Sequence, residues 1–461
     1  MTVKSDTVFI KQFWIFLVLL LAFTIIASIF MKWPNQIFLF GAIIISIIGI
    51  FAPRYLFLAI LVFLPFSFER DIYFIHGLNM AIPTELLMLL VIIFFVFGIF
   101  TRGKFTWYHS PLNLAVCIYV FIMIISAIGT NHPMVSVKTT SRSLAYILVG
   151  FGITRYMIID KRLLKNVLIA MFFMGVCLVF YGFYTQINAG VAVYQDIALP
   201  FFKNHCIYAE YLCIIFAILL AFTLGFGKIK GRTLLVSGSI LFACAILMTF
   251  VRGAWLAVFV LLSYAIVIQG RKAPFKLIAI LLVLMIAAAG FALTMDLTEL
   301  LTQRINRLTD FRYVTNFDRI DRWMAAFSMF LHHPVLGVGY GNYPEEYYQY
   351  IWFIKATTLT DRMGAHNLYL EILAETGFLG LIAFLGLVVT FFRESFKLLK
   401  ELNDSFWLSL TAGVVGAMIT YLVHGVVNNL GPSDKLELLF WILIGMPILI
   451  RKLGTDKIVP S

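Results

Sequence analysis

The chain has 461 residues, of which 62% are hydrophobic and only 13% charged, and its mean hydropathy is +0.97. A soluble core cannot bury that much apolar surface, so the composition excludes a soluble globular protein and indicates one that crosses a membrane many times. The formal net charge of +12 does not by itself indicate a nucleic-acid partner, because basic residues in membrane proteins also follow topology.

Fourteen apolar segments follow one another along the chain. They cover residues 12–30, 36–51, 54–66, 84–100, 112–129, 142–158, 165–187, 205–224, 232–250, 252–269, 275–294, 366–391, 406–427 and 436–451. Most are long enough to span a bilayer as helices, and the first is too long for the apolar region of a signal peptide. The pattern predicts an all-α, polytopic membrane helical bundle of about 12–14 transmembrane helices.

The basic residues are distributed by side of the membrane. When the N-terminus is placed in the cytoplasm, twenty Lys and Arg residues fall at cytoplasmic helix ends and six in the short loops opposite. This positive-inside bias predicts that both termini are cytoplasmic, and it explains most of the net charge without nucleic acid. The five cysteines are scattered and form no C-x-x-C pair, which favours small apolar side chains over disulfides or metal ligands.

One connection is much longer than the others and divides the chain. We expect N-terminal transmembrane helices over 1–294, one long extracytoplasmic loop over 295–365 and C-terminal transmembrane helices over 366–461, all within one integral membrane domain. Loops of this length are usually functional or disordered, and the aromatic residues of this one argue against disorder. Apolar residues at helical spacing predict an amphipathic helix over about 318–331 that lies against the membrane surface.

Three arginines on the outer side are candidates for anion binding. Arg319 and Arg322 lie one turn apart on the polar face of the amphipathic helix, where they either pair with Asp318 and Asp321 as a solvated face or clamp an anion through their guanidinium groups. Arg252 lies between two apolar segments at the outer membrane edge. It is either an interfacial arginine that snorkels or, as we favour, one that reaches into a polar site.

The segment from His366 to Gly377 places a histidine, an asparagine and two carboxylates at the start of an apolar helix. A neutral His366 at a helix N-terminus, near arginines, could act as a general base, although a lone histidine more often has only a hydrogen-bonding role. Asn367, Glu371 and Glu375 are expected on one helical face, where we favour a supporting role in the bundle. We expect no metal site and no cofactor, because the outer side carries no D-x-D or similar carboxylate cluster.

Three motifs together resemble the superfamily of O-antigen ligases and O-antigen polymerases. They are Arg252-Gly253-Ala254-Trp255, then Arg319-x-x-x-Trp323 followed by His333-Pro334-x-x-Gly337-x-Gly339, and finally His366-Asn367-x-Tyr369-Leu370-x-x-x-x-Glu375-x-Gly377. Their order and context fit, and the resemblance is specific over about 250–380. The chain differs from the family pattern in having Val251 where a serine is common and in having a second arginine, Arg322; the spacing to Trp323 favours Arg319 as the clamp.

The resemblance implies a GT-C-like, metal-independent, inverting glycosyltransferase in the bacterial inner membrane, with its active site on the periplasmic face. The donor would be a glycan on undecaprenyl pyrophosphate, whose leaving group Arg252 and Arg319 or Arg322 would bind. His366 would take the proton of the acceptor hydroxyl, and the acceptor would be a lipid A-core sugar for a ligase. The other partner is the lipid bilayer.

Three alternatives remain open from the sequence. A polymerase would use a second lipid-linked repeat unit as the acceptor, and a relative that glycosylates protein would use neither. A transporter for an anionic solute belongs to another class, with Arg252 as its binding charge. The absence of an internal repeat and the one-sided long loop count against a transporter.

Overall fold

The structure, a computed structural model, describes residues 53–71, 79–102, 108–189, 197–202, 204–225, 231–269, 314–351, 364–431 and 433–455. Six helices in this part of the chain are long and apolar enough to cross a membrane. The predicted polytopic helical bundle is confirmed. The predicted helices at 12–30, 36–51 and 275–294 lie outside the described residues.

The elements follow the apolar segments closely. Up to residue 189 they are α3 (Pro53–Phe63), η1 (Leu64–Phe66), β1 (Phe68–Asp71), β2 (Asn79–Ile82), α4 (Thr84–Arg102), α5 (Pro111–Ile128), α6 (Pro133–Ile147), the π-helical η2 (Leu148–Ile153), α7 (Thr154–Met157) and α8 (Lys161–Ala189). After these come α9 (His205–Leu224), α10 (Arg232–Met248), α11 (Arg252–Gln269), α14 (Val314–His332), α15 (Tyr343–Glu346), η5 (Tyr347–Gln349), α16 (Leu368–Glu401), α17 (Ser405–His424) and α18 (Asp434–Gly454).

Two local features differ from the segments expected from hydropathy. α6 begins at Pro133, well before residue 142, because the polar residues of its first turns face other protein elements; Ser136, for example, donates a hydrogen bond to the carbonyl of Tyr340. A two-stranded antiparallel hairpin, β1 with β2, was not expected, and it pairs Phe68 with Ile82. Glu85 holds β2 by accepting a hydrogen bond from the nitrogen of Ala81.

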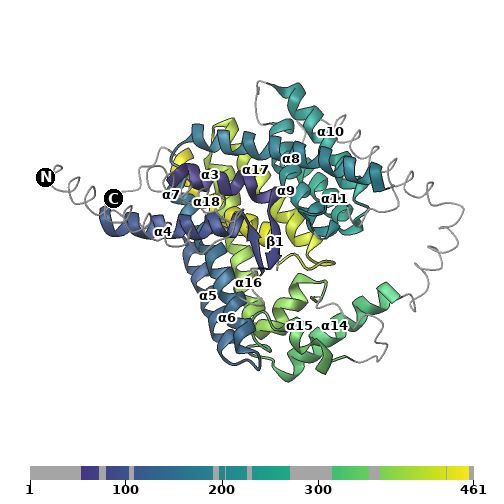
Figure 1. The fold of residues 1–461 in the computed structure, drawn as a ribbon. Helices are drawn as coiled ribbons and strands as arrows, with labels where there is room; N and C mark the ends of the chain where they lie inside the picture. The colour runs from purple at the N-terminus through teal and green to yellow at the C-terminus, as the bar shows by residue number, and fades with distance from the viewer. Residues whose placement is uncertain are drawn as a thin grey trace, which may run out of the picture.

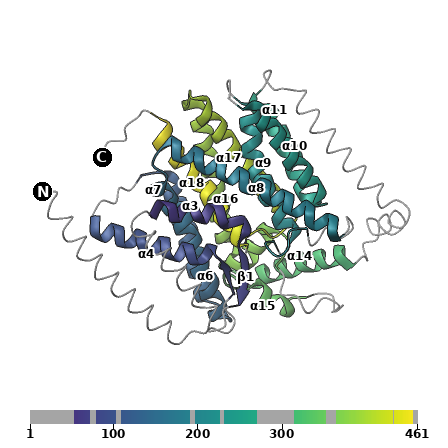
Figure 2. The ribbon, with the colours of Figure 1, turned by 45° about the horizontal axis from the view of Figure 1, so that its top comes forward.

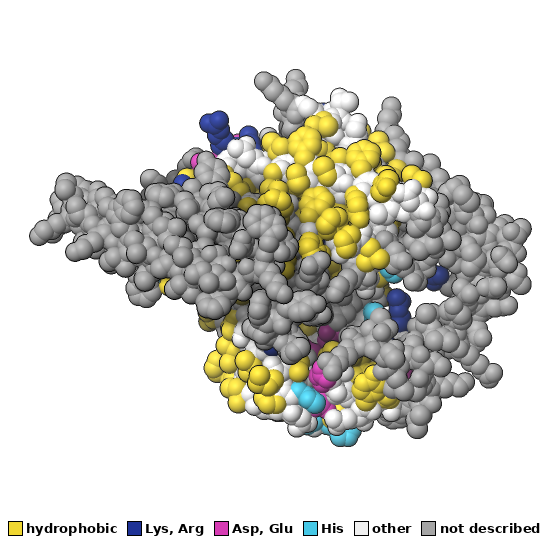
Figure 3. Space-filling view, in the orientation of Figure 1, with side chains coloured by type: hydrophobic (Ala, Val, Ile, Leu, Met, Phe, Trp, Pro, Cys, Tyr) yellow, Lys and Arg dark blue, Asp and Glu magenta, His cyan; other side chains and the backbone are white. Residues whose placement is uncertain are grey.

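The bundle is arranged in two neighbouring groups. α9, α10, α11 and α17 pack on one another, while α5, α6 and α16 lie side by side and extend toward α14 and α15 (Figures 1 and 2). We call the end of the bundle that carries α14 and α15 the loop end. Large apolar side chains of α8 and α11, such as Phe173, Phe180 and Phe259, are exposed, and Figure 3 shows such side chains covering the upper face. An exposed apolar surface of this extent is the surface that a bilayer covers.

α16 is interrupted at Gly377, where φ is +65° and ψ is −167°. The chain after α14 docks into this break, because the nitrogen of Val338 donates to the carbonyl of Ala374 and the nitrogen of Phe378 to that of Pro334. A Cβ on Gly337 or on Gly377 would collide with the facing backbone. The two glycines of the motifs therefore allow a close contact between the long loop and α16.

The predicted amphipathic helix is part of α14. Its Ala325, Ala326 and Met329 are buried, and Ala326 packs in one small cluster with Ala365 and Ala374. Ile320, Phe327 and Leu331 are exposed on α14. Contact of these exposed side chains with the membrane surface stays a prediction.

Candidate functional site

His366 lies two residues before α16, and its backbone has a φ of +51°. This conformation is uncommon for a residue other than glycine and often marks a functional position. Asn367 fixes the start of the helix, because its Oδ1 accepts hydrogen bonds from the nitrogens of Tyr369 and Leu370, both at 3.0 Å, and so caps α16. The Nδ2 of Asn367 donates to the carbonyl of Val426 at 2.8 Å.

Glu371 supports the histidine from within the first turn of α16. Its Oε2 accepts a hydrogen bond from the nitrogen of Ala365 at 2.8 Å, and its Oε1 accepts one from Nδ2 of Asn429 at 2.6 Å. One turn later, the Oε1 of Glu375 accepts from the nitrogen of Tyr343 at 3.1 Å. Both carboxyl groups are buried and join α16 to the loop end. Asn367 caps α16 and therefore lies before its first turn, not on the helical face that Glu371 and Glu375 share.

Arg322 approaches the same segment from α14. Its Nη1 donates to the carbonyl of Gly364 at 3.2 Å, and its guanidinium group lies 5.5 Å from the centre of the Tyr347 ring. Arg322 is buried, whereas Arg319, one turn earlier, is exposed. The structure thus brings both arginines to His366 and gives them different surroundings.

The electrostatics of His366 follow from this arrangement. Burial, and after it the charges of Arg322 and Arg319, lower the pKa of His366 from 6.5 to about 4. A cation is disfavoured where solvent is excluded and other cations are near. His366 is therefore neutral at pH 7 and can accept a proton.

Arg252 is the first residue of α11 and is exposed. Its neighbour Gly253 is buried, and a Cβ there would collide with His424 and Val427. Asn367 is bonded to Val426 in that same connection after α17. The starts of α11 and α16 therefore meet the same short segment, while the described contacts include none between Arg252 and His366.

Sequence reasoning missed a second buried pair close by. Nδ1 of His424 lies 2.9 Å from Oε2 of Glu210, both side chains are fully buried, and Thr420 donates to the same carboxyl group. Neither His424 nor Glu210 is among the candidate site residues expected from the sequence. The available signal was a carboxylate inside the apolar segment 205–224, since such a group needs a polar partner.

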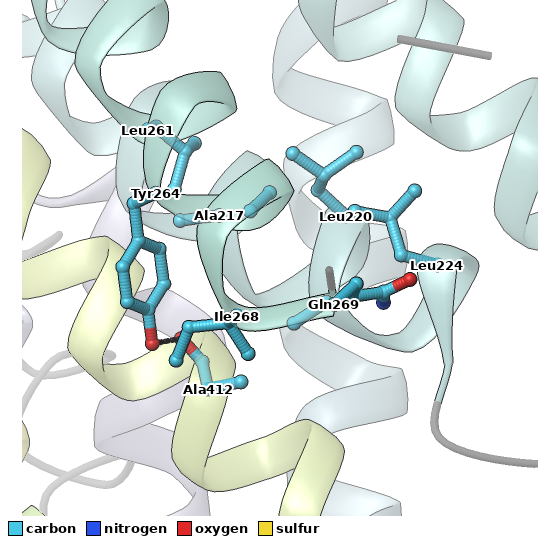
Figure 4. Close-up of a pocket in the computed structure, with 10 residues that line it drawn as sticks. Ala217, Leu220, Leu224, Leu261, Tyr264, Ile268, Gln269 and Ala412 are labelled. Atoms are coloured by element: carbon cyan, nitrogen blue, oxygen red, sulfur yellow. Dashed lines mark hydrogen bonds between the residues drawn. The ribbon is translucent and has the colours of Figure 1, made fainter. Parts of the chain in front are cut away.

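Two cavities in the described part of the chain differ in the side chains that line them. A small cleft between α9, α11 and α17 has no charged side chain in its lining, and the hydroxyl of Tyr264 donates to the carbonyl of Ala412 at 3.3 Å beside it (Figure 4). A larger cavity with both polar and apolar lining lies between α5, α6, α16, α17 and α18 and includes Glu371 and Glu375 in its wall. On the face seen in Figure 3, acidic and histidine side chains gather below the apolar surface.

Within the described part of the chain, no group of three or more His, Cys, Asp or Glu side chains is placed to hold a metal ion. His332 is bonded through Nδ1 to the carbonyl of Ser328, inside its own helix. That the protein works without a metal ion stays a prediction.

Residues 237–385 match the family model described as O-antigen ligase. The predicted resemblance to the O-antigen ligase and polymerase superfamily is confirmed. The matched region contains Arg252, Arg319, Arg322 and His366, together with Glu371 and Glu375. No curated protein matches the chain. The match and the apolar helices indicate a multi-pass membrane glycosyltransferase of the O-antigen ligase or polymerase type.

Proposed function

We propose that the chain is a metal-independent, inverting glycosyltransferase that moves a glycan from undecaprenyl pyrophosphate to a sugar hydroxyl. It would act at the outer face of the bacterial inner membrane, with both termini in the cytoplasm. The observation that carries the proposal is the position of His366 directly before α16 and next to the segment that Arg322 binds, within the region that matches the O-antigen ligase family.

His366 is the proposed general base. The acceptor hydroxyl oxygen attacks the anomeric carbon from the face opposite the leaving group, and its proton passes to the imidazole as the bond to pyrophosphate breaks. A positioned base of this kind contributes roughly 10²–10⁴ to the rate. The bonds from Asn367 and Glu371 to the segments around it support this role, since they fix the backbone on both sides of the histidine.

The arginines are proposed to bind the pyrophosphate. Arg319 is exposed and able to meet a ligand, whereas Arg322 already donates to Gly364, which supports Arg319 as the main clamp. Arg252 would approach from the start of α11. Guanidinium groups keep their charge and bind phosphate oxygens in pairs, so they stabilise the negative charge that grows on the leaving group.

Donor binding would also activate the base. In the structure, Arg322 and Arg319 contribute to the low pKa of His366. A pyrophosphate between them would offset their charge, and the pKa of His366 would rise toward the pH of the cell. A base with a pKa closer to the working pH accepts the proton more readily. The acceptor hydroxyl would therefore be deprotonated mainly when the donor is in place.

The acceptor defines the biological role, and we favour a ligase that uses lipid A-core sugar. Deletion of the chain followed by a gel of surface glycans tests this choice. Bare core with accumulated lipid-linked polymer would support the ligase, and a ladder collapsed to a single repeat would show a polymerase instead. Unchanged surface glycans would contradict both and favour an anionic-solute transporter.

A further inference from the structure

The larger cavity, at the loop end, has a volume of about 280 Å³ and is lined in part by Tyr340, Gly341 and Pro344 of the long loop. Its wall contains Tyr119, Met123, Lys138, Thr139, Arg142, Ser143, Ile147, Tyr340, Gly341, Pro344, Leu368, Glu371, Ile372, Glu375, Phe384, Tyr421, Asn429, Gly431, Glu437, Phe440 and Trp441. These residues come from six helices and two loops, so the cavity exists only in the assembled fold.

The cavity adjoins the segment that carries His366. Glu371 and Asn429 line it and are bonded to each other, and the same Glu371 accepts from the nitrogen of Ala365. A Cβ on Gly364 would collide with both Glu371 and Asn429. The backbone on the N-terminal side of His366 therefore lies against the wall of the cavity.

The wall combines acceptors with aromatic rings. Three carboxyl groups line it, from Glu371, Glu375 and Glu437. A carboxyl group keeps acceptor capacity in either protonation state, so each of the three can take further hydrogen bonds from hydroxyl groups. The rings of Tyr421, Phe440 and Trp441 in the same wall offer flat apolar faces. A sugar ring presents hydroxyl groups around an apolar face, so it complements a wall of this kind.

The wall offers few cations to an anionic ligand. Arg142 is bonded to Glu85, with Nε 2.7 Å from Oε1, so its charge is already paired. Lys138 is exposed, and it is the other cation in the wall. A pyrophosphate is therefore expected at the arginines near His366 and not in the cavity.

We infer that the cavity is a subsite for one uncharged sugar ring of the acceptor, which it would hold with a hydroxyl group toward His366. The inference rests on the proposed function. The volume is close to the lower end of the roughly 300–1,000 Å³ that ligand pockets span, which suits one ring and not a whole repeat unit. Acceptor and donor would then meet at His366 from different sides, one through carboxyl groups and the other through arginines.

The test measures binding without catalysis. Purified full-length protein in detergent is titrated by calorimetry with the methyl glycosides of glucose, galactose and N-acetylglucosamine, and separately with inorganic pyrophosphate. Two variants change the wall outside the His366 segment. Glu437→Gln removes one acceptor, and Thr139→Trp fills the space, which keeps the test valid if either variant fails to fold. Glu401→Gln, at the far end of α16, is the matched control.

We expect at least one glycoside to bind, and each wall variant to weaken its binding by about tenfold or more, Glu437→Gln through a changed hydrogen bond and Thr139→Trp through lost space. Pyrophosphate binding should not change, and Glu401→Gln should bind as the wild type does. Absence of glycoside binding, or wild-type binding by both wall variants, would overturn the inference. Weaker pyrophosphate binding in Glu437→Gln would also overturn it and assign the cavity to the donor.

A transfer assay with the same variants distinguishes a subsite for the acceptor sugar from a subsite for the donor sugar. An acceptor subsite predicts a higher KM for the acceptor and an unchanged KM for the lipid-linked donor, and the reverse result would overturn the acceptor assignment. Binding of a glycoside does not require transfer. Normal binding without transfer would therefore contradict the proposed function alone, and transfer with unchanged KM values in the variants would contradict the subsite alone.

Discussion

The carboxyl group of Glu371 accepts a hydrogen bond from the backbone nitrogen of Ala365 at 2.8 Å, so a residue within α16 holds the residue that precedes His366. On the other side of the histidine, Asn367 caps the helix and is bonded to Val426. His366 is thereby fixed by backbone contacts on both sides. Its position and the charges around it determine how substitutions nearby should affect titration, stability and transfer.

The pKa of His366 should rise when Arg322 is replaced. Burial and then the arginine charges lower this pKa to about 4, so Arg322→Gln should move it toward 6.5, whereas Arg393→Gln on the far part of α16 should not. Titration of 13C-labelled histidine by NMR measures the value directly. An unchanged pKa in Arg322→Gln would contradict the electrostatic effect of the arginine.

The same shift predicts how stability depends on pH. The folded pKa of His366 lies below the ordinary 6.5, so the unfolded chain binds the proton first as the pH falls. This histidine's contribution to stability is therefore present above pH 6.5 and is lost between about pH 6.5 and 4. The loss should be smaller in Arg322→Gln, which thermal melting across that pH range measures against Arg393→Gln. A steeper loss of stability in Arg322→Gln would contradict this prediction.

Glu371→Ala should lower both stability and transfer. It leaves the buried nitrogen of Ala365 and the amide of Asn429 without their acceptor, and an unsatisfied buried group costs about 1–3 kcal/mol. Because the His366 backbone loses its support, kcat should fall more than donor affinity does. Thermal melting and steady-state kinetics measure the two effects. A variant with wild-type kcat would show that Glu371 does not position the base.

Gly377→Ala should destabilise the protein by about 2 kcal/mol or more, because its φ of +65° with a ψ of −167° is nearly restricted to glycine. The added Cβ would also meet the backbone of Val335. Gly386→Ala in the same helix is the control, since no atom lies within 4 Å of a Cβ there. Comparable melting temperatures for the two variants would contradict the tight docking of the loop on α16.

Arg252→Lys and Arg319→Lys should each weaken donor binding by about tenfold or more, because an ammonium group cannot form the paired hydrogen bonds of a guanidinium. Because lysine keeps the positive charge, the substitution tests the hydrogen-bond geometry of the guanidinium group. Arg393→Lys serves as the control. Binding of lipid-linked donor to purified protein is the measurement, and wild-type affinity in both variants would exclude these arginines from the pyrophosphate site.

The positions of the helices could be predicted from the sequence, because the length of an apolar segment is set by the membrane it crosses. The segments 205–224 and 252–269 coincide with α9 and α11. The convergence of Arg319, Arg322 and His366 was also predictable, since topology placed them on one side. The hairpin of β1 and β2 was not, because its strands have only four residues each.

Contacts between distant segments account for the rest. A glycine in an apolar run is tolerated within a helix, so the break at Gly377 becomes visible only when the loop at Pro334 is seen to dock there. In the same way, the role of Glu210 follows only from its contact with His424, and the role of Glu437 follows only from the cavity that it lines together with Glu371. Such pairings depend on how the helices pack, and hydropathy carries no information on that packing.

The proposed mechanism depends above all on His366 acting as the base of a glycan transfer that needs no metal. Transfer by purified protein from lipid-linked donor to acceptor in the presence of EDTA tests both parts, with His366→Ala beside the exposed control His333→Ala. We expect full activity for wild type and His333→Ala, a loss of about 10²–10⁴ in kcat for His366→Ala, and unchanged donor binding in that variant. Wild-type activity in His366→Ala, or activity that EDTA abolishes and a divalent ion restores, would contradict the mechanism.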